Sequence, residues 1–210
     1  MVSADSARGW ADFGREQIPV RGFAVASRQR GADYARRGVL VCGVARMVIK
    51  AALIATAYHE AGHAMMCWSL GVRSKRVSIV QGEDSMGSFL HERVVRGHPE
   101  TDNSNRMRLS LERYAAIALA GPIAQQLYNS RSFRTYHASK DYKIAATCAF
   151  RVNGSEESAK AWLKWIQIRT KDQLRVFWPI VDRLAKRLLD AKTLHDVKIS
   201  EIISLNPPPN

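Results

Sequence analysis

Three residues of this chain have the types and the spacing to do chemistry: His59, Glu60 and His63, which form an HExxH motif. On a helix, residues four apart project from one face, so both imidazoles can direct a ring nitrogen to a single ion. Zinc accepts imidazole nitrogen, and catalytic zinc sites hold three protein ligands and a water. Glu60 is rotated by about 100° around the helix, so we expect it to reach the water as a general base. The motif therefore predicts a hydrolytic zinc site whose third ligand comes from elsewhere.

The element that positions this motif must be a long helix. Helical apolar spacing runs from about residue 43 to Leu70, and Gly71 stands where a helix would end. Alternating residues 75–80 predict a strand, and a second strand is expected at 89–95 after a loop at 82–87.

The remainder of the chain is predicted to be helical. We expect helices at 105–128, with a kink or a break at Gly121-Pro122, and at 139–150, with Ser139 as the N-cap. A long helix should follow the Ser155 cap to about Leu188, with a bend at Pro179, before a short closing segment at 194–205. Four tryptophans at helical spacing are predicted to lie in the core: Trp68, Trp162, Trp165 and Trp178. The predicted class is mostly α with a small β-sheet, an α+β fold.

Length and composition fit one domain with appendages. The chain has 210 residues, 46% hydrophobic and 24% charged, enough for a sizeable core. Residues 1–38 are rich in Arg, Gly, Ala and Ser and predict a basic, flexible N-terminal arm. Residues 39–205 are the predicted catalytic domain, and the Pro-rich residues 206–210 a disordered tail.

The sequence predicts no integral membrane segment. Its most apolar stretch, residues 39–58, is interrupted by Arg46 and Lys50, and charges near mid-span are costly in lipid. The start lacks the basic-then-apolar order of a secretory signal. Three cysteines far apart, with no CxxC pair, indicate free thiols in a reducing compartment. We therefore expect a cytoplasmic protein.

The formal net charge of +13 favours anionic partners such as nucleic acid or acidic proteins. The basic residues are dispersed, however, and form no compact patch with interleaved aromatic residues. A solvated basic surface is the preferred interpretation, and nucleic-acid binding is the weaker one.

The run from Ala57 to Ala64, AYHEAGHA, resembles the peptidase core of the FtsH-type ATP-dependent zinc metalloproteases. Residues 118–124, ALAGPIA, are similar to that family's Leu-Ala-Gly helix. Residues 139–142, SKDY, lie where the family has a Ser-Asn-Asp or Gly-Asp-Tyr segment, and residues 189–194 resemble its C-terminal turn. The resemblance covers about residues 50–204 and implies a helical, zincin-like peptidase domain with HExxH on a long helix.

The resemblance also implies the third zinc ligand. In that family it is an aspartate on a later helix, which corresponds here to Asp141. Glu83 and Asp84 are the competing candidates, but they lie in a Gly-bounded loop. His137, four residues before Asp141, is a weaker candidate for lining the cleft. The HExxHxxGxxH pattern is absent, because Met66 and Ser69 replace its Gly and third His.

Two features depart from the family. Gln125 and Gln126 stand where acidic residues are usual, which puts a carboxylate near the metal in doubt. No GxxxxGK[ST] loop occurs in the sequence, so we expect no ATP binding and a peptidase domain without its ATPase.

The predicted function is a zinc metalloendopeptidase, a hydrolase of flexible or unfolded polypeptides. The strand at residues 76–80 resembles the family's active-site edge strand, which binds substrate in extended form; a purely structural hairpin is the alternative. Two other functions stay open: a zinc-stabilised module that binds nucleic acid or acidic protein, and a peptidase-like subunit that docks on a separate ATPase. A homo-oligomer also stays open.

Overall fold

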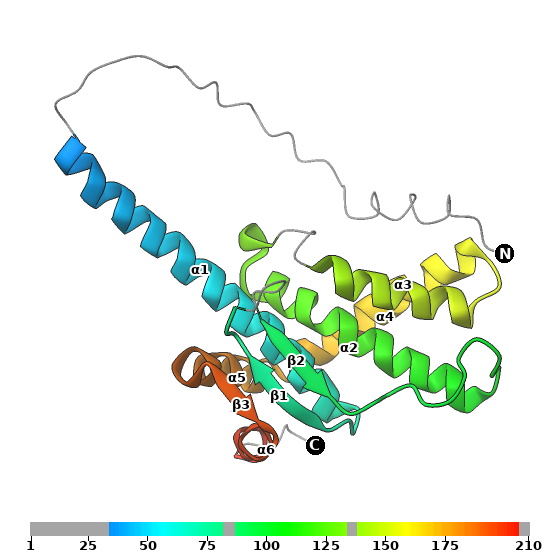
Figure 1. Cartoon of the computed structure of the whole chain (residues 1–210). Coiled ribbons are helices and arrows are strands. Elements are labelled where there is room, and N and C mark those ends of the chain that lie inside the picture. Colours follow the sequence, from blue (N-terminus) through cyan, green and yellow to red (C-terminus); the bar gives the residue numbers. More distant parts are fainter. Residues whose placement is uncertain (1–33, 82–86, 134–137, 206–210) are drawn as a thin grey trace. The chain divides into compact units, whose positions relative to one another are not determined.

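The computed structural model describes residues 34–81, 87–133 and 138–205 (Figure 1). The chain divides into two compact units, Met1–Val44 and Ala45–Asn210. All helices after α1, the sheet and the candidate site belong to the second unit. Among the described residues, no helix is both long and apolar enough to span a bilayer.

The described fold is mostly helical with one small sheet, as predicted. Its elements follow in chain order: α1 (Tyr34–Ser69), β1 (Ser74–Ser78), β2 (Ser88–His91), α2 (Asn105–Asn129), the 3-10 turn η2 (Ser130–Ser132), α3 (Ser139–Val152), α4 (Glu156–Val176), α5 (Trp178–Ala191), β3 (Thr193–His195) and α6 (Asp196–Ser204). Helix α1, which carries HExxH, begins at Tyr34, nine residues before the predicted start.

Helix α2 is the centre of the helical layer. It packs against α3 and α4, which also pack against each other, and every residue from Ile117 to Gln125 is buried. Pro122 costs the helix one hydrogen bond, yet α2 continues to Asn129. Of the predicted kink or break at Gly121-Pro122, the break therefore does not occur. Contacts on all sides hold the backbone helical despite the proline.

The sheet has the order β2-β1-β3, and both pairings are antiparallel. Val77 of β1 lies opposite Phe89 of β2 and Leu194 of β3. Since β1 is paired on both sides, the prediction that residues 76–80 form an edge strand is wrong. In the part of the sheet that the structure describes, β2 and β3 are the edges. The three-residue strand β3 was not predicted.

Three further predictions, on one helix cap, one helix boundary and the burial of tryptophans, are wrong. Ala138, not Ser139, is the N-cap of α3, and no side chain caps that helix. The long helix predicted after Ser155 is two helices, α4 and α5, which Phe177 separates; the Ser155 cap itself is confirmed. None of the four tryptophans is buried: Trp68 and Trp165 are exposed, and Trp162 and Trp178 are half-buried.

Aromatic and polar contacts of Tyr58 attach the motif-bearing part of α1 to α5 and to the end of α2. Its ring stacks on Tyr128 at 3.9 Å and on Trp178 at 5.7 Å between centroids. Its hydroxyl donates to Asp182 at 2.6 Å, and Lys186 also pairs with Asp182, at 2.7 Å. Burial raises the pKa of Asp182, but the hydrogen bonds from Lys186 and Tyr58 outweigh it and leave that pKa below its ordinary value.

Candidate metal centre

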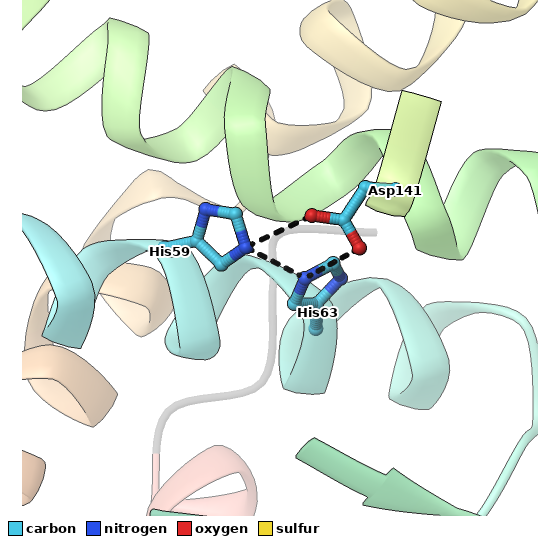
Figure 2. Close-up of side chains that lie close together, drawn as sticks. All are labelled: His59, His63 and Asp141. Carbon is cyan, nitrogen blue, oxygen red and sulfur yellow. Dashed lines mark hydrogen bonds and ion pairs between the residues drawn. The ribbon is translucent and has the colours of Figure 1, made fainter. Parts of the chain in front are cut away.

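His59 and His63 project from the same face of α1, as their spacing requires (Figure 2). Their Nε2 atoms are 3.1 Å apart, and the ring planes are inclined at 76°. Two nitrogens bound at 2.0–2.1 Å to one tetrahedral zinc are about 3.3 Å apart. The two imidazoles are therefore placed as ligands of a single ion would be.

Asp141, in the first turn of α3, faces both imidazoles (Figure 2). Its Oδ2 lies 3.2 Å from His59 Nε2 and its Oδ1 lies 3.8 Å from His63 Nε2. The three candidate ligand atoms all lie within 4.8 Å of one another, the one such His, Cys, Asp and Glu group among the described residues. Two helices distant in sequence thus bring together two nitrogens and a carboxylate, a donor set that suits zinc.

The charges of these groups also suit a cation. Burial, and next the neighbouring His59, lower the pKa of His63 to about 4, so its imidazole is neutral at pH 7. Burial raises the pKa of Asp141, but the hydrogen bond with His59 and the charges of both histidines hold it below its ordinary value. Burial lowers the pKa of His59, and contacts with Asp141 and Glu60 more than offset this. The site therefore combines the neutral imidazole of His63 with the carboxylate of Asp141. The nearby acidic side chains of Asp141 and Glu60 favour positive charge at His59.

The oxygens beside the two Nδ1 atoms come from α2. His63 Nδ1 lies 2.8 Å from the carbonyl oxygen of Ile117, and His59 Nδ1 lies 3.2 Å from Gln125 Oε1. An oxygen of either kind accepts a hydrogen bond from an Nδ1–H group. With the proton on Nδ1, each Nε2 presents its lone pair to the centre, as a metal ligand must.

Glu60 follows His59 directly in the chain, and one of its two carboxylate oxygens is unsatisfied in the described structure. The residue is 7% exposed, and its buried Oε2 has no hydrogen-bond partner among the described residues. Burial, opposed by His59 and aided by Asp141, raises the pKa of Glu60 to about 7. A buried carboxylate oxygen without a partner costs about 1–3 kcal/mol or more, and a pKa near neutrality is what a general base requires.

Glycines make room for the site on two sides. A Cβ on Gly121 of α2 would overlap His63 Nε2 and would lie 2.7 Å from His59 Nε2. A Cβ on Gly87, just before β2, would lie 2.6 Å from Glu60 Oε1. The absence of a side chain at residue 121 therefore lets the α2 backbone approach both imidazoles at their Nε2 atoms, where any larger residue would displace the candidate ligands.

Two neighbours of the site carry no signal in the sequence. The ring of Phe89, in β2, stacks on the His63 imidazole with centroids 5.5 Å apart and planes at 11°. Gln125 was considered only as a missing acid, whereas its amide contacts His59. The proposed competitors Glu83 and Asp84, and the cleft candidate His137, lie outside the described residues.

Comparison with known proteins agrees with this chemistry over part of the chain. The sequence is 33% identical over 142 residues to an ATP-dependent zinc metalloprotease FtsH of Rickettsia felis, which covers 66% of this chain and 20% of that protein. The FtsH of Rickettsia prowazekii is 33% identical over 97 residues, 45% of this chain and 14% of its own. The chain thus spans about a fifth of the length of these relatives. No protein-family model matches the sequence. The chain is a distant relative, over part of its length, of FtsH zinc metalloproteases.

Proposed function

We propose that this chain is a zinc-dependent metallopeptidase that hydrolyses peptide bonds in flexible or unfolded polypeptides. One observation carries the proposal: Glu60, whose buried Oε2 has no hydrogen-bond partner among the described residues, lies beside three converging ligand atoms, from His59, His63 and Asp141. A site that only stabilised the fold would have no use for Glu60, because an unsatisfied buried acid is destabilising. The partial similarity to FtsH zinc metalloproteases supports the same function.

In this proposal His59, His63 and Asp141 hold the zinc. When bound there, zinc polarises the substrate carbonyl and makes water acidic enough to be deprotonated near neutral pH. Glu60 accepts a proton at Oε2 from the water that attacks the carbonyl carbon. It then returns that proton to the amine nitrogen as the C–N bond breaks. Burial raises the pKa of Glu60 to about 7, which suits a group that both accepts and returns a proton near neutral pH.

The substrate is proposed to bind along β2. Among the described residues this strand is paired only with β1. Its Phe89 stacks on His63, and Gly87, which precedes the strand, abuts Glu60. The free edge of a strand offers backbone hydrogen bonds to an extended peptide with little demand on its sequence. Folded proteins rarely present such a segment, whereas unfolded chains do.

Hydrolysis is proposed to proceed without ATP bound by this chain, whose 210 residues contain no GxxxxGK[ST] loop. For these residues acting alone, we propose substrates that are already extended.

The test is cleavage of a dye-labelled, unstructured protein such as casein by the zinc-loaded chain in the absence of ATP. Glu60→Gln should bind zinc normally and lose about 100-fold or more of the rate, since general base catalysis contributes about 10²–10⁴-fold. Glu157→Gln, which changes an exposed glutamate of α4, is the matched control and should cleave like wild type. Equal cleavage by wild type and Glu60→Gln would exclude the proposal. A zinc-stabilised binding module predicts that equality, together with salt-sensitive binding of its partner.

A further inference from the structure

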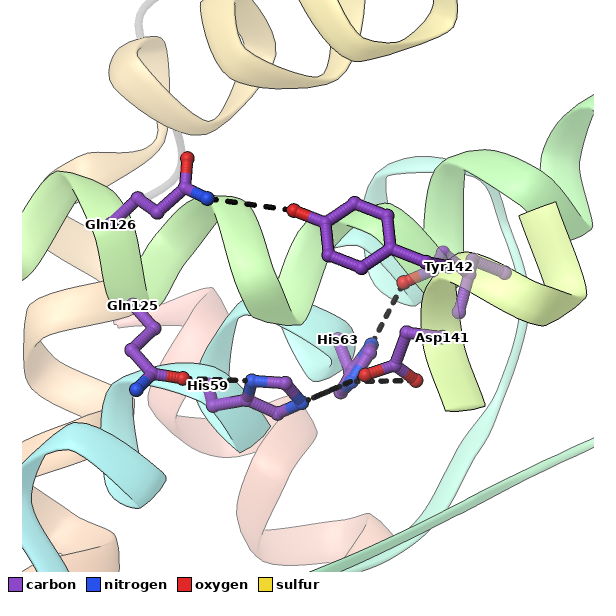
Figure 3. Close-up of polar contacts among 7 residues, drawn as sticks. His59, His63, Gln125, Gln126, Asp141 and Tyr142 are labelled. Carbon is purple, nitrogen blue, oxygen red and sulfur yellow. Dashed lines mark hydrogen bonds and ion pairs between the residues drawn. The ribbon is translucent and has the colours of Figure 1, made fainter. Parts of the chain in front are cut away.

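Two adjacent glutamines on α2 point toward different helices (Figure 3). The amide of Gln125 faces His59 of α1, with Oε1 3.2 Å from Nδ1. The amide of Gln126 faces α3, where its Nε2 lies 3.4 Å from the hydroxyl oxygen of Tyr142. Gln125 is 4% exposed, whereas Gln126 is exposed. Of these two glutamines, only Gln125 is both buried and in contact with a candidate ligand.

The chemistry of His59 determines how the Gln125 amide must be oriented. A neutral imidazole that binds a cation through Nε2 carries its proton on Nδ1. That Nδ1–H group needs an acceptor, and the amide oxygen of Gln125 supplies one while the NH2 group would repel it. The contact therefore selects one tautomer of His59 and one direction of its ring.

The second histidine is oriented by an equivalent contact. His63 Nδ1 lies 2.8 Å from the backbone oxygen of Ile117, eight residues before Gln125 on the same helix. Both imidazoles are thus oriented from α2 by neutral oxygens. The negative charges that the described site contains are the carboxylates of Asp141 and Glu60.

We propose that Gln125 is a positioning residue, which holds His59 in the zinc-binding tautomer and orientation through a neutral acceptor oxygen. This inference rests on the proposed zinc site. It assigns the role to the acceptor oxygen and not to charge or to packing. A carboxylate at position 125 should therefore replace the amide, whereas an apolar side chain of similar size should not.

The test is zinc affinity, measured by competition with a chromophoric chelator, for wild type, Gln125→Leu and Gln125→Glu. Loss of the contact that orients a metal-binding histidine typically costs about 10–100-fold in affinity, and we expect that loss for Gln125→Leu. Gln125→Glu should bind at least as tightly as wild type. Gln126→Leu, a matched change one residue away that contacts no candidate ligand, should stay within about threefold of wild type.

A second measurement needs no variant and covers the case in which Gln125→Leu does not fold. In zinc-loaded wild type, the ring proton of His59 should be on Nδ1 and protected from exchange, as read by nitrogen-15 NMR of the imidazoles. A fast-exchanging Nδ1–H, or a proton on Nε2, would overturn the inference.

The affinities separate the two proposals. If wild type binds zinc and Gln125→Leu binds it within threefold, the role of Gln125 is wrong and the metal site stands. Equal losses in Gln125→Leu and Gln125→Glu, or in Gln126→Leu, also overturn that role. If wild type itself binds no zinc, both the metal site and the inference are wrong.

Discussion

Replacing Gly121 with alanine should damage the candidate metal centre while leaving the fold in place. Helix α2 meets the two imidazoles at this residue, which is buried in the middle of the helix. Alanine adds a single methyl group, and it is a better helix former than glycine by about 1 kcal/mol. The substitution therefore tests the space beside the ligands with the least possible change elsewhere.

The size of the effect follows from the distances. The new Cβ would lie 2.7 Å from His59 Nε2 and would overlap His63 Nε2. A carbon contact is normally about 3.5 Å, so the His59 ring must retreat by roughly 0.8 Å. Metal–ligand distances tolerate only about ±0.2 Å. We therefore expect zinc affinity to fall by more than the about 10–100-fold that a lost outer contact costs.

The stability of the zinc-free fold should change much less. Overpacking of a core typically costs about 1–3 kcal/mol, and the gain of about 1 kcal/mol in helix propensity offsets part of it. Imidazoles can also rotate away from the methyl group when no ion holds them.

The assay pairs chelator competition for zinc with thermal unfolding of the zinc-free protein. Gly154→Ala is the matched control, because a Cβ there meets nothing within 4 Å, and it should bind zinc like wild type. Zinc affinity of Gly121→Ala within threefold of wild type would refute the proposed position of the ion. A variant that fails to fold would instead show that the methyl group disrupts helix packing.

Three further predictions concern the scaffold and are read from urea unfolding of the zinc-free protein. Gly62→Ala should destabilise it by about 1–2 kcal/mol after the gain in helix propensity is included, because the new Cβ would lie 2.6 Å from a backbone oxygen of α2. An unchanged free energy of unfolding would mean that α1 and α2 are farther apart than in the structure. Ser155→Ala should lower the free energy of unfolding by about 1 kcal/mol, because the α4 cap is lost. Ser139→Ala should lower it by less than about 0.5 kcal/mol, since that side chain caps no helix. Equal losses in the two variants would contradict the assigned caps. The pKa of Asp182 is held below its ordinary value by hydrogen bonds from a lysine and a tyrosine. Its contribution to the free energy of unfolding is therefore present above about pH 4 and is lost as pH falls through the folded-state pKa. Asp182→Asn should lower that free energy by about 0.2–1 kcal/mol at pH 7 and show a smaller further loss on acidification than wild type; an unchanged acid dependence would contradict this.

The histidine pair of the site was accessible to sequence reasoning, because helical spacing alone places His59 and His63 on one face. Asp141 was not accessible in this way. It is separated from the motif by about eighty residues, and its first-turn position is ordinary for an acid that stabilises a helix start. The resemblance to a known family identified it, and the described structure places its carboxylate beside both imidazoles.

Predictions of the fold were wrong where the sequence pattern within an element is weak. Strand β3 has three residues, too few for an alternating pattern, and its pairing with β1 is what removes β1 from the edge that the family resemblance implied. Trp162 and Trp165 have helical spacing, but the buried stripe of α4 consists of other residues: Ala159, Leu163, Ile166, Thr170 and Leu174. Each tryptophan is one position, or about 100° around the helix, away from a member of that stripe. Periodicity predicted a helix with a buried face and did not identify which aromatic residues lie on it.

The role proposed for Gln125 could not come from sequence, because a buried glutamine carries no pattern of its own. Comparison with acidic residues of the related proteases suggested a loss, whereas the geometry shows an amide oxygen at the place where His59 requires an acceptor.

His59, His63 and Asp141 are proposed to bind one zinc ion together, and zinc content per chain tests this most directly. Elemental analysis after dialysis should give one zinc per wild-type chain and a large loss in Asp141→Ala. Asp172→Ala, which changes an exposed aspartate of α4, should retain one zinc. Equal zinc content in Asp141→Ala and wild type, or none in wild type, would contradict the proposed site.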